Sequence, residues 1–172
     1  KLNMQNWRKS EKFTEVSICD HEVHNDLRGN LWTIWKESLE PKNINFNHDK
    51  VSVSKKDVLR GIHGDFKSHK YISVLYGEIF FVIADCRNLE NNSNNIPFET
   101  MNLNGDRPCS ILLPPGFGNA FFVKSDIVVF HYKWSYKGSY PDVEDQFTVK
   151  WNDSRLNIPW PHNNPILQER DK

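Results

Sequence analysis

The chain has 172 residues, and its 22 lysine and arginine residues balance 22 aspartate and glutamate residues, so its formal net charge at pH 7 is zero. A chain of this length can bury a large core. A neutral chain provides no overall field to attract nucleic acid or an anionic membrane, so we expect neither partner. Any anion must be bound by a local group of cationic side chains.

Cysteine content and hydropathy indicate the cellular compartment of the protein. The three cysteines, Cys19, Cys86 and Cys109, are too few and too scattered for a disulfide framework, and they form no Cys-x-x-Cys pair. The apolar stretches are much shorter than the roughly 20 residues of a membrane-spanning helix, and the first residues lack the apolar segment of a signal peptide. We therefore expect a cytoplasmic protein with reduced thiols.

Short β-type runs separated by turn residues recur along the chain. They cover residues 13–19, 31–35, 50–54, 58–62, 70–75, 78–85, 111–113, 120–123, 127–133 and 146–151. A weak helical pattern runs from Thr33 to Leu39 and overlaps the second run. The many aromatic residues suit the inner faces of a sandwich of sheets. The pattern predicts an antiparallel β-sandwich or barrel with little helix.

No repeat or composition break divides the chain, which predicts a single domain over residues 1–172. The asparagine-rich stretch 88–95 predicts a surface loop. Residues 158–165 include three prolines, which predict an extended tail. The large apolar side chains of Ile158 and Trp160 are expected to dock this tail on the body.

The segment from Val58 to His63 carries two candidate functional residues. In a regular strand Arg60 and His63 would point to opposite faces, because side chains alternate. Gly61 between them permits a bulge that aims both into one pocket. A histidine beside a guanidinium suits a base that acts on an anionic substrate. A hydrogen-bonded histidine under a surface arginine fits these residues equally well.

Other polar residues could join this pair inside a barrel. An imidazole can remove a proton, the Lys70 ammonium can stabilise an oxyanion, and the Tyr132 hydroxyl can return a proton from the opposite face. Asp171 could hold the histidine in the required tautomer if the tail folds back. Taken singly, Lys70 also fits a solvated strand edge and Tyr132 a cross-strand aromatic contact. Together they meet the needs of proton abstraction next to a carbonyl.

These residues occur in an ordered series that resembles the dTDP-4-dehydrorhamnose 3,5-epimerase family, from about Arg28 to Asp171. The series is Val58-Leu59-Arg60-Gly61-Ile62-His63, Lys70, Gly77-Glu78-Ile79-Phe80, Leu113-Pro114-Pro115-Gly116-Phe117, Tyr132-Lys133 and Trp151-Asn152-Asp153. The resemblance implies an all-β, antiparallel jelly-roll barrel of the cupin type with a few short helices. It also implies an epimerase that inverts C3, C5 or both in a nucleotide-diphospho-4-keto sugar, without a cofactor or a metal.

The resemblance assigns catalytic roles to four residues. His63 is similar to the family's base, and Asp171 stands where the family has the carboxylate paired with that base. Tyr132 matches the general acid, and Lys70 matches the lysine near the 4-keto oxygen. These assignments agree with the chemistry of the residue types.

The resemblance also implies a homodimer and a diphosphate site. Arg28 and Arg60 fall where the family has arginines on the diphosphate, one of which often comes from the partner subunit. Bidentate guanidinium contacts suit this anion even in a neutral chain.

Departures from the family pattern bear on the substrate. Gly64-Asp65 follow the histidine where an aromatic residue and a glutamine are usual, and Asn119 replaces a common histidine; we expect Asp65 and Asn119 to bind substrate. The Arg-Gly-Ile-His-Gly-Asp variant resembles the branch that acts on GDP-linked 4-keto heptoses in bacterial capsule pathways. The residues leave open GDP or dTDP, heptose or hexose, and whether Tyr136 or Tyr140 lines the site.

Two other classes of protein remain as alternatives. A metal-dependent cupin oxygenase or isomerase needs about three converging ligands, which His63, His69 and Glu78 could supply. A sugar-binding cupin without activity would keep the barrel but would not require an acid and a base on opposite faces.

Overall fold

Strands make up nearly all of the regular structure. The computed structural model of the protein describes residues 6–37, 43–91, 94–136 and 145–172. Its strands are β1 (Asn6–Lys9), β2 (Ser17–Asp20), β3 (His24–Asp26), β4 (Gly29–Leu31), β5 (His48–Lys55), β6 (Leu59–Gly64), β7 (Lys70–Tyr76), β8 (Glu78–Asp85), β9 (Phe98–Asn104), β10 (Cys109–Leu113), β11 (Phe117–Val123), β12 (Ile127–Trp134) and β13 (Phe147–Thr148). The described residues also contain the short 3-10 helices η2 (Leu89–Asn91) and η4 (Glu169–Asp171).

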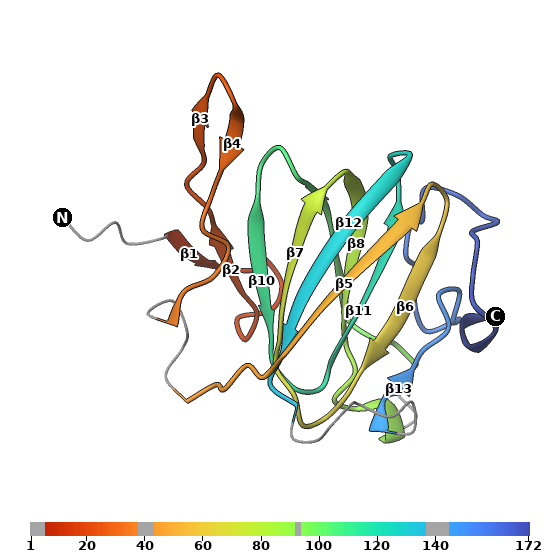
Figure 1. The fold of residues 1–172 in the computed structure, drawn as a ribbon. Helices are drawn as coiled ribbons and strands as arrows, with labels where there is room; N and C mark the ends of the chain where they lie inside the picture. Colours follow the sequence, from red (N-terminus) through yellow and green to blue (C-terminus); the bar gives the residue numbers. More distant parts are fainter. Residues whose placement is uncertain (1–5, 38–42, 92–93, 137–144) are drawn as a thin grey trace.

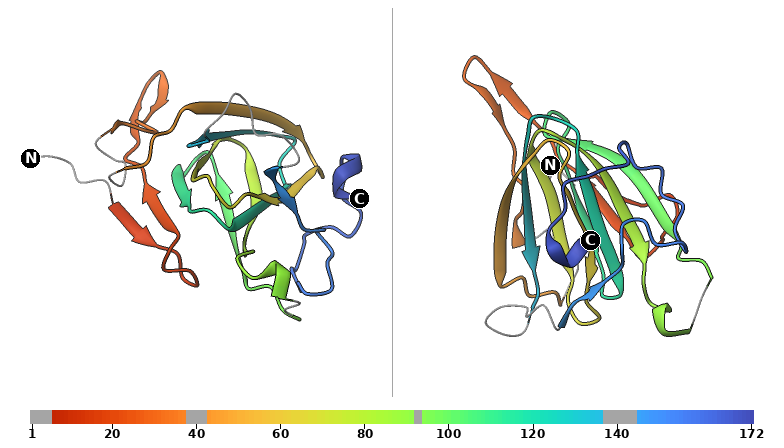
Figure 2. Two further views of the ribbon diagram at one scale, coloured as in Figure 1. Left: turned by 90° about the horizontal axis from the view of Figure 1, so that it is seen from below. Right: turned by 90° about the vertical axis from the view of Figure 1, so that its right-hand side faces the viewer.

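Two antiparallel sheets lie against each other and form the predicted cupin-like sandwich (Figure 1, Figure 2). Within the described residues, one sheet has the strand order β1-β2-β10-β7-β12-β5 and the other the order β13-β6-β11-β8-β9. Strands β3 and β4 pair only with each other, and their hairpin stands away from both sheets (Figure 1).

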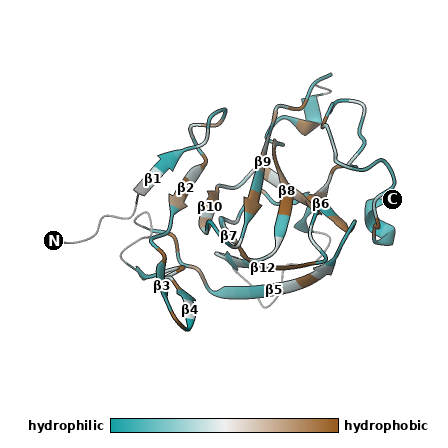
Figure 3. Cartoon of the chain, turned by 90° about the horizontal axis from the view of Figure 1, so that it is seen from above, coloured by the Kyte–Doolittle hydropathy of each residue, from teal (hydrophilic) through white to brown (hydrophobic). Residues whose placement is uncertain are grey.

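Apolar side chains fill the space between the sheets, because each strand turns every second residue inward. Ile72 and Val74 on β7 and Val128 and Phe130 on β12 are almost fully buried in this core. Figure 3 shows hydrophobic residues on the strands of both sheets and a mostly hydrophilic segment around the C-terminus. The start of β7 and the end of β12 border the cavity described below.

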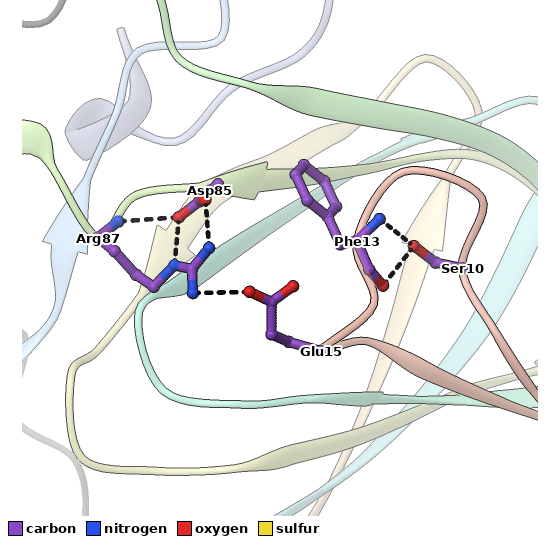
Figure 4. Close-up of polar contacts among 5 residues, drawn as sticks. All are labelled: Ser10, Phe13, Glu15, Asp85 and Arg87. Carbon is purple, nitrogen blue, oxygen red and sulfur yellow. Dashed lines mark hydrogen bonds and ion pairs between the residues drawn. The ribbon is translucent and has the colours of Figure 1, made fainter.

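Polar contacts attach the N-terminal segment to the end of β8 (Figure 4). The Arg87 guanidinium donates to Asp85 at 2.7 and 2.9 Å and to Glu15 at 2.8 Å. Two residues before Glu15, the Phe13 ring enters the core, and its backbone is held by the Ser10 hydroxyl. The segment that precedes β2 is therefore part of the folded domain.

The tail after β13 runs in an extended conformation over the body, as predicted. Ile158 and Trp160 dock it on an apolar cluster, with the Trp160 and Phe80 ring centroids 5.6 Å apart. Farther along, the Leu59 N–H donates to the Ile166 carbonyl at 3.0 Å. These contacts bring η4 against β6.

The predicted helix over 33–39 is wrong for the residues that the structure describes. Residues 33–36 have no regular secondary structure, Glu37 alone has a 3-10 conformation, and residues 38 and 39 lie outside the described part. The Ile34 carbonyl accepts a hydrogen bond from the Tyr71 hydroxyl on β7 at 2.8 Å. Contact with the six-stranded sheet thus overrides the weak local helical pattern.

Candidate active site

A cavity of about 620 Å³ opens between the two sheets at the start of β7 and the end of β12. Within the described residues its lining includes four cationic side chains and no carboxylate. The lining comprises Lys50, Ser52, Arg60, His63, Lys70, Ile72, Asn119, Phe121, Phe130, Tyr132, Trp134, Gln146, Gln168 and Arg170. These four cationic side chains form the kind of local cationic group that a chain of zero net charge needs in order to bind an anion.

The predicted bulge at Gly61 brings Arg60 and His63 to the same cavity. His63 pairs with Asn119 on β11 and Arg60 with Phe121, so three steps along β6 match two steps along β11. Gly61 has a φ of 110°, and a Cβ there would lie 2.4 Å from the Asn119 carbonyl oxygen. Only glycine fits this position, and it reverses the alternation that would separate the two side chains.

His63 and Asp171 form a hydrogen-bonded pair, because the tail folds back as the predicted role of Asp171 requires. The His63 Nε2–H donates to Asp171 Oδ1 at 2.5 Å, and the Gln168 amide donates to Oδ2 at 3.0 Å. Burial of the Asp171 carboxyl opposes its ionisation, but these hydrogen bonds and the His63 ring outweigh burial and lower its pKa. With the proton held on Nε2, Nδ1 carries the lone pair that can act as a base.

Tyr132 lies on the wall opposite His63, since it comes from β12 of one sheet while His63 comes from β6 of the other. The Tyr132 ring packs edge-on against Trp134, with centroids 5.2 Å apart. Between these walls, the Lys70 ammonium on β7 donates to Asn119 Oδ1 at 3.4 Å. The cavity thus brings together an imidazole, a phenol and an ammonium group, which are suited to proton transfer on two faces of one ligand.

The Lys70 side chain is buried, and its environment favours the neutral amine. Burial is the main cause of a pKa lowered to about 8; the charges of Arg170 and Lys50 act in the same direction, and Asp65 opposes them. The ammonium lies 5.0 Å from the centre of the Trp134 ring, where the aromatic face attracts a cation. Lys70 therefore changes charge close to neutral pH.

If the Lys70 ammonium is required, kcat should fall as the pH rises through about 8, because the lysine is charged below its pKa and neutral above it. Replacing Lys50 with Gln removes a cation that lowers this pKa, so the alkaline limb of the profile should move to higher pH. Profiles of kcat from about pH 6 to about pH 10 for both proteins measure the effect. If kcat falls at the same alkaline pH in both proteins, the group that titrates there is not Lys70.

Two predicted substrate-binding residues do not line the cavity. The Arg28 side chain is 89% exposed on the β3–β4 hairpin and pairs with Asp26 at 2.5 Å. Asp65 is buried in the turn after β6, where its Oδ1 accepts the backbone N–H groups of Lys67 and Ser68 at 2.8 and 2.6 Å. The prediction that Asp65 binds substrate is corrected, because this carboxylate holds a turn.

Sequence reasoning missed several lining residues, above all Arg170. Its Nη2 lies 3.0 Å from both ring nitrogens of His63. Its position beside Asp171 in the chain is the signal that could have found it. Of the two tyrosines left open, Tyr136 is outside the lining and donates to Asp145 at 2.6 Å, while Tyr140 lies outside the described residues.

The structure does not bring together the triad considered for a metal site. Neither His69 nor Glu78 is among the residues that line the cavity with His63, and Glu78 pairs with Lys124 at 2.8 Å. No three His, Cys, Asp or Glu side chains within the described part of the chain are grouped to hold a metal ion.

Comparison with known proteins identifies the family. A family model described as dTDP-4-dehydrorhamnose 3,5-epimerase matches residues 10–172. The chain belongs to this family. It is accordingly a nucleotide-sugar 3,5-epimerase, an isomerase.

Individual relatives match this epimerase over nearly its whole length. The dTDP-4-dehydrorhamnose 3,5-epimerase of Escherichia coli strain K12 is 29% identical over 163 residues, covering 89% of this chain and 84% of that protein. The enzyme of the same description from Methanothermobacter thermautotrophicus is 28% identical, with 90% and 85% coverage.

Solved structures agree with the fold of the epimerase. A Legionella pneumophila dTDP-6-deoxy-D-glucose-3,5-epimerase in complex with dTDP-4-keto-L-rhamnose has a TM-score of 0.83, with 28% identity and coverage of 98% of this chain and 90% of that chain. A Bacillus anthracis dTDP-4-dehydrorhamnose 3,5-epimerase with TDP and PPi bound also has a TM-score of 0.83, with 27% identity and coverage of 98% and 97%.

No helix in the described residues is long and apolar enough to cross a membrane.

Proposed function

We propose that this epimerase inverts C3, C5 or both in a GDP-linked 4-keto heptose, with His63 as base and Tyr132 as acid. The observation that carries the proposal is the placement of the His63–Asp171 pair and Tyr132 on opposite walls of one cavity, with Lys70 between them. An acid and a base on opposite faces are what inversion next to a ketone requires.

The reaction begins at a carbon next to the 4-keto group. His63 Nδ1 takes the proton from that carbon, and the electron pair of the broken C–H bond moves toward the ketone to form an enolate. The Lys70 ammonium stabilises the negative charge on the enolate oxygen, and Asp171 stabilises the imidazolium. Tyr132 then donates its proton to the opposite face of the same carbon, which inverts the centre; solvent restores both groups.

Arg60 suits the diphosphate of this substrate. Its side chain lies at the cavity with Nε donating to the Ser54 hydroxyl at 2.8 Å, which orients the guanidinium. Two N–H groups in one plane can then pair with phosphate oxygens. We assign the second phosphate contact to Arg28 of the partner subunit in a homodimer, because Arg28 lies on a hairpin that stands away from its own cavity.

An exposed apolar face supports the dimer. Val51 and Val53 on the outer face of β5 are 60% and 64% exposed, and Leu31 at the end of the hairpin is 70% exposed. Neighbouring apolar side chains that remain this accessible are typical of a surface covered by another subunit. A second copy of the chain that covers this face would also bring its β3–β4 hairpin, and with it Arg28 of the partner subunit, close to the cavity of this subunit.

Replacing Val51 and Val53 together with Lys should convert the dimer to a monomer, because like charges from both subunits would meet across a two-fold interface. Analytical ultracentrifugation gives the mass in solution. Thr148→Lys, which adds a lysine on an exposed edge strand of the other sheet, is the control and should remain dimeric. A monomeric unmodified protein, or a double variant that stays dimeric, would contradict the prediction.

The similarity of residues 60–65 to the GDP-heptose branch supports the choice of sugar. Incubation in heavy water with GDP-linked 4-keto heptose and with a dTDP-linked 4-keto-6-deoxyhexose tests it, since each inverted centre takes up one deuterium. We expect faster uptake from the GDP-linked sugar. Faster uptake from the dTDP-linked sugar would overturn the substrate assignment, and no uptake from either would overturn the proposed reaction.

A further inference from the structure

The buried ammonium of Lys70 has no ion-pair partner among the described residues. Arg170 and Lys50 repel it, and the Asp65 carboxylate attracts it without a hydrogen bond between them. Its hydrogen bond to Asn119 Oδ1 is long, at 3.4 Å. A buried lysine stays charged only where other groups offset the loss of water. A further source of stabilisation is therefore needed.

The Trp134 ring is in a position to provide it. Trp134 and Lys70 are direct partners between β12 and β7, so their side chains lie on the same face of the sheet, and they are only 4% and 7% exposed. The Lys70 Nζ lies over the ring, 5.0 Å from its centre. This distance is inside the limit of roughly 6 Å for a cation–π contact, which is strongest for tryptophan and in a site without water.

Lys50 places a second ammonium over the same ring, 4.9 Å from its centre. It comes from β5, which lies on the opposite side of β12 from β7. The indole therefore attracts two ammonium groups that repel one another. The titratable side chains around Lys70 are Lys50 on β5, His63 on β6, Asp65 in the turn after β6, Tyr132 on β12 and Arg170 on η4, while β10 contributes no charged residue.

An aromatic ring and a carboxylate stabilise an ammonium with different consequences for a ligand. A carboxylate accepts hydrogen bonds from the N–H groups and neutralises the charge. The face of a ring attracts the cation through its quadrupole and leaves the N–H groups available. Lys70 has three N–H donors, and its hydrogen bond to Asn119 uses one of them. The others can reach an oxygen of a bound ligand.

We propose that Trp134 is a positioning residue whose ring keeps the Lys70 ammonium charged and leaves its N–H groups for the enolate oxygen of the substrate. The use of these groups on an enolate rests on the proposed function. The attraction between ring and ammonium does not, because it is a property of the enzyme alone.

Carbon-13 NMR of protein labelled at lysine Cε tests the attraction without a substrate. Tryptophan analogues with increasing numbers of fluorine atoms, inserted only at position 134 by stop-codon suppression, keep nearly the size of the indole. Fluorine withdraws negative charge from the ring face, so the charged lysine is stabilised less and the Lys70 pKa should fall along the series from its value of about 8. We expect a total shift of about one pH unit. The Lys70 signal is the one that Lys70→Gln removes.

The same analogues at Trp7 are the control. Trp7 lies on the edge strand β1, outside the cavity lining, so the Lys70 pKa should not change. A ring that merely excludes water from Lys70 would leave the pKa constant, because the fluorinated rings fill the same space. A constant or rising Lys70 pKa along the series at position 134 would overturn the proposal. Circular dichroism and the melting temperature establish that each protein is folded.

Profiles of kcat against pH give a second test, with the substrate that takes up deuterium. The alkaline fall in kcat should move to lower pH along the series at position 134, by the same amount as the Lys70 pKa, because the ammonium is lost at a lower pH. An alkaline fall that stays at the same pH while the Lys70 pKa decreases would contradict the proposed use of the ammonium.

The two proposals fail in different ways. If neither nucleotide sugar reacts, the proposed function is wrong, but the NMR titration still decides whether the Trp134 ring stabilises the ammonium. If a sugar reacts and the Lys70 pKa does not respond to fluorination, only the role of Trp134 is lost.

Discussion

Replacing His63 with Asn is expected to slow deuterium uptake into a 4-keto substrate by a factor of about 10² to 10⁴, the range typical for loss of a general base. Asparagine is close in size to histidine and can still bond to Asp171, so the cavity should persist. Mass spectrometry of the substrate after timed incubation in heavy water measures the rate. Binding of the nucleoside diphosphate, followed by calorimetry, should be unchanged.

His131→Asn is the matched control for this variant. His131 neighbours Tyr132 on β12 but faces the other side of the sheet, where its Nε2 pairs with Asp49 at 2.9 Å. Uptake in this control should match that of the unmodified protein. Uptake at the full rate in folded His63→Asn would move the role of base to another residue.

Replacing Tyr132 with Phe should reduce net inversion about 100-fold or more while deuterium uptake falls much less. The base on the opposite wall can still remove a proton and return a deuteron to the same face. Proton NMR gives the configuration of the sugar and mass spectrometry gives the deuterium content in the same reaction. The two measurements separate exchange from inversion.

Tyr136→Phe is the control, because it removes the same hydroxyl group from a tyrosine that lies outside the cavity lining and bonds to Asp145. This variant should leave inversion near its normal rate. Net epimerisation at the normal rate in Tyr132→Phe would show that another group is the acid.

The sequence is most informative where local pattern and tertiary structure coincide. The predicted run at 78–85 matches β8 residue for residue, because most of its apolar side chains are buried in an inner strand of its sheet. The bulge at Gly61 is predictable because glycine is the residue that a bulge tolerates best, and here it separates two candidate functional residues. The convergence of Lys70, Tyr132 and Asp171 on one site follows from the family resemblance, not from periodicity.

Other features depend on contacts that a local pattern does not contain. The run predicted at 31–35 is a strand only at its first residue. Strands β1, β3 and β9 were not predicted, because polar residues interrupt any apolar alternation in them. Asp65 follows a candidate base in sequence, but the turn after β6 directs its carboxylate to backbone N–H groups. Arg170 reaches His63 only because the tail docks beside β6.

The imidazole of His63 and its carboxylate partner are 108 positions apart in the chain. Such a separation means that closing this loop carries an entropic cost that both sheets and the docked Trp160 must offset before the pair can form. After dilution from denaturant, β-structure should therefore appear first in the far-ultraviolet circular dichroism spectrum. Deuterium uptake into the 4-keto substrate should recover later, at the last stage of folding.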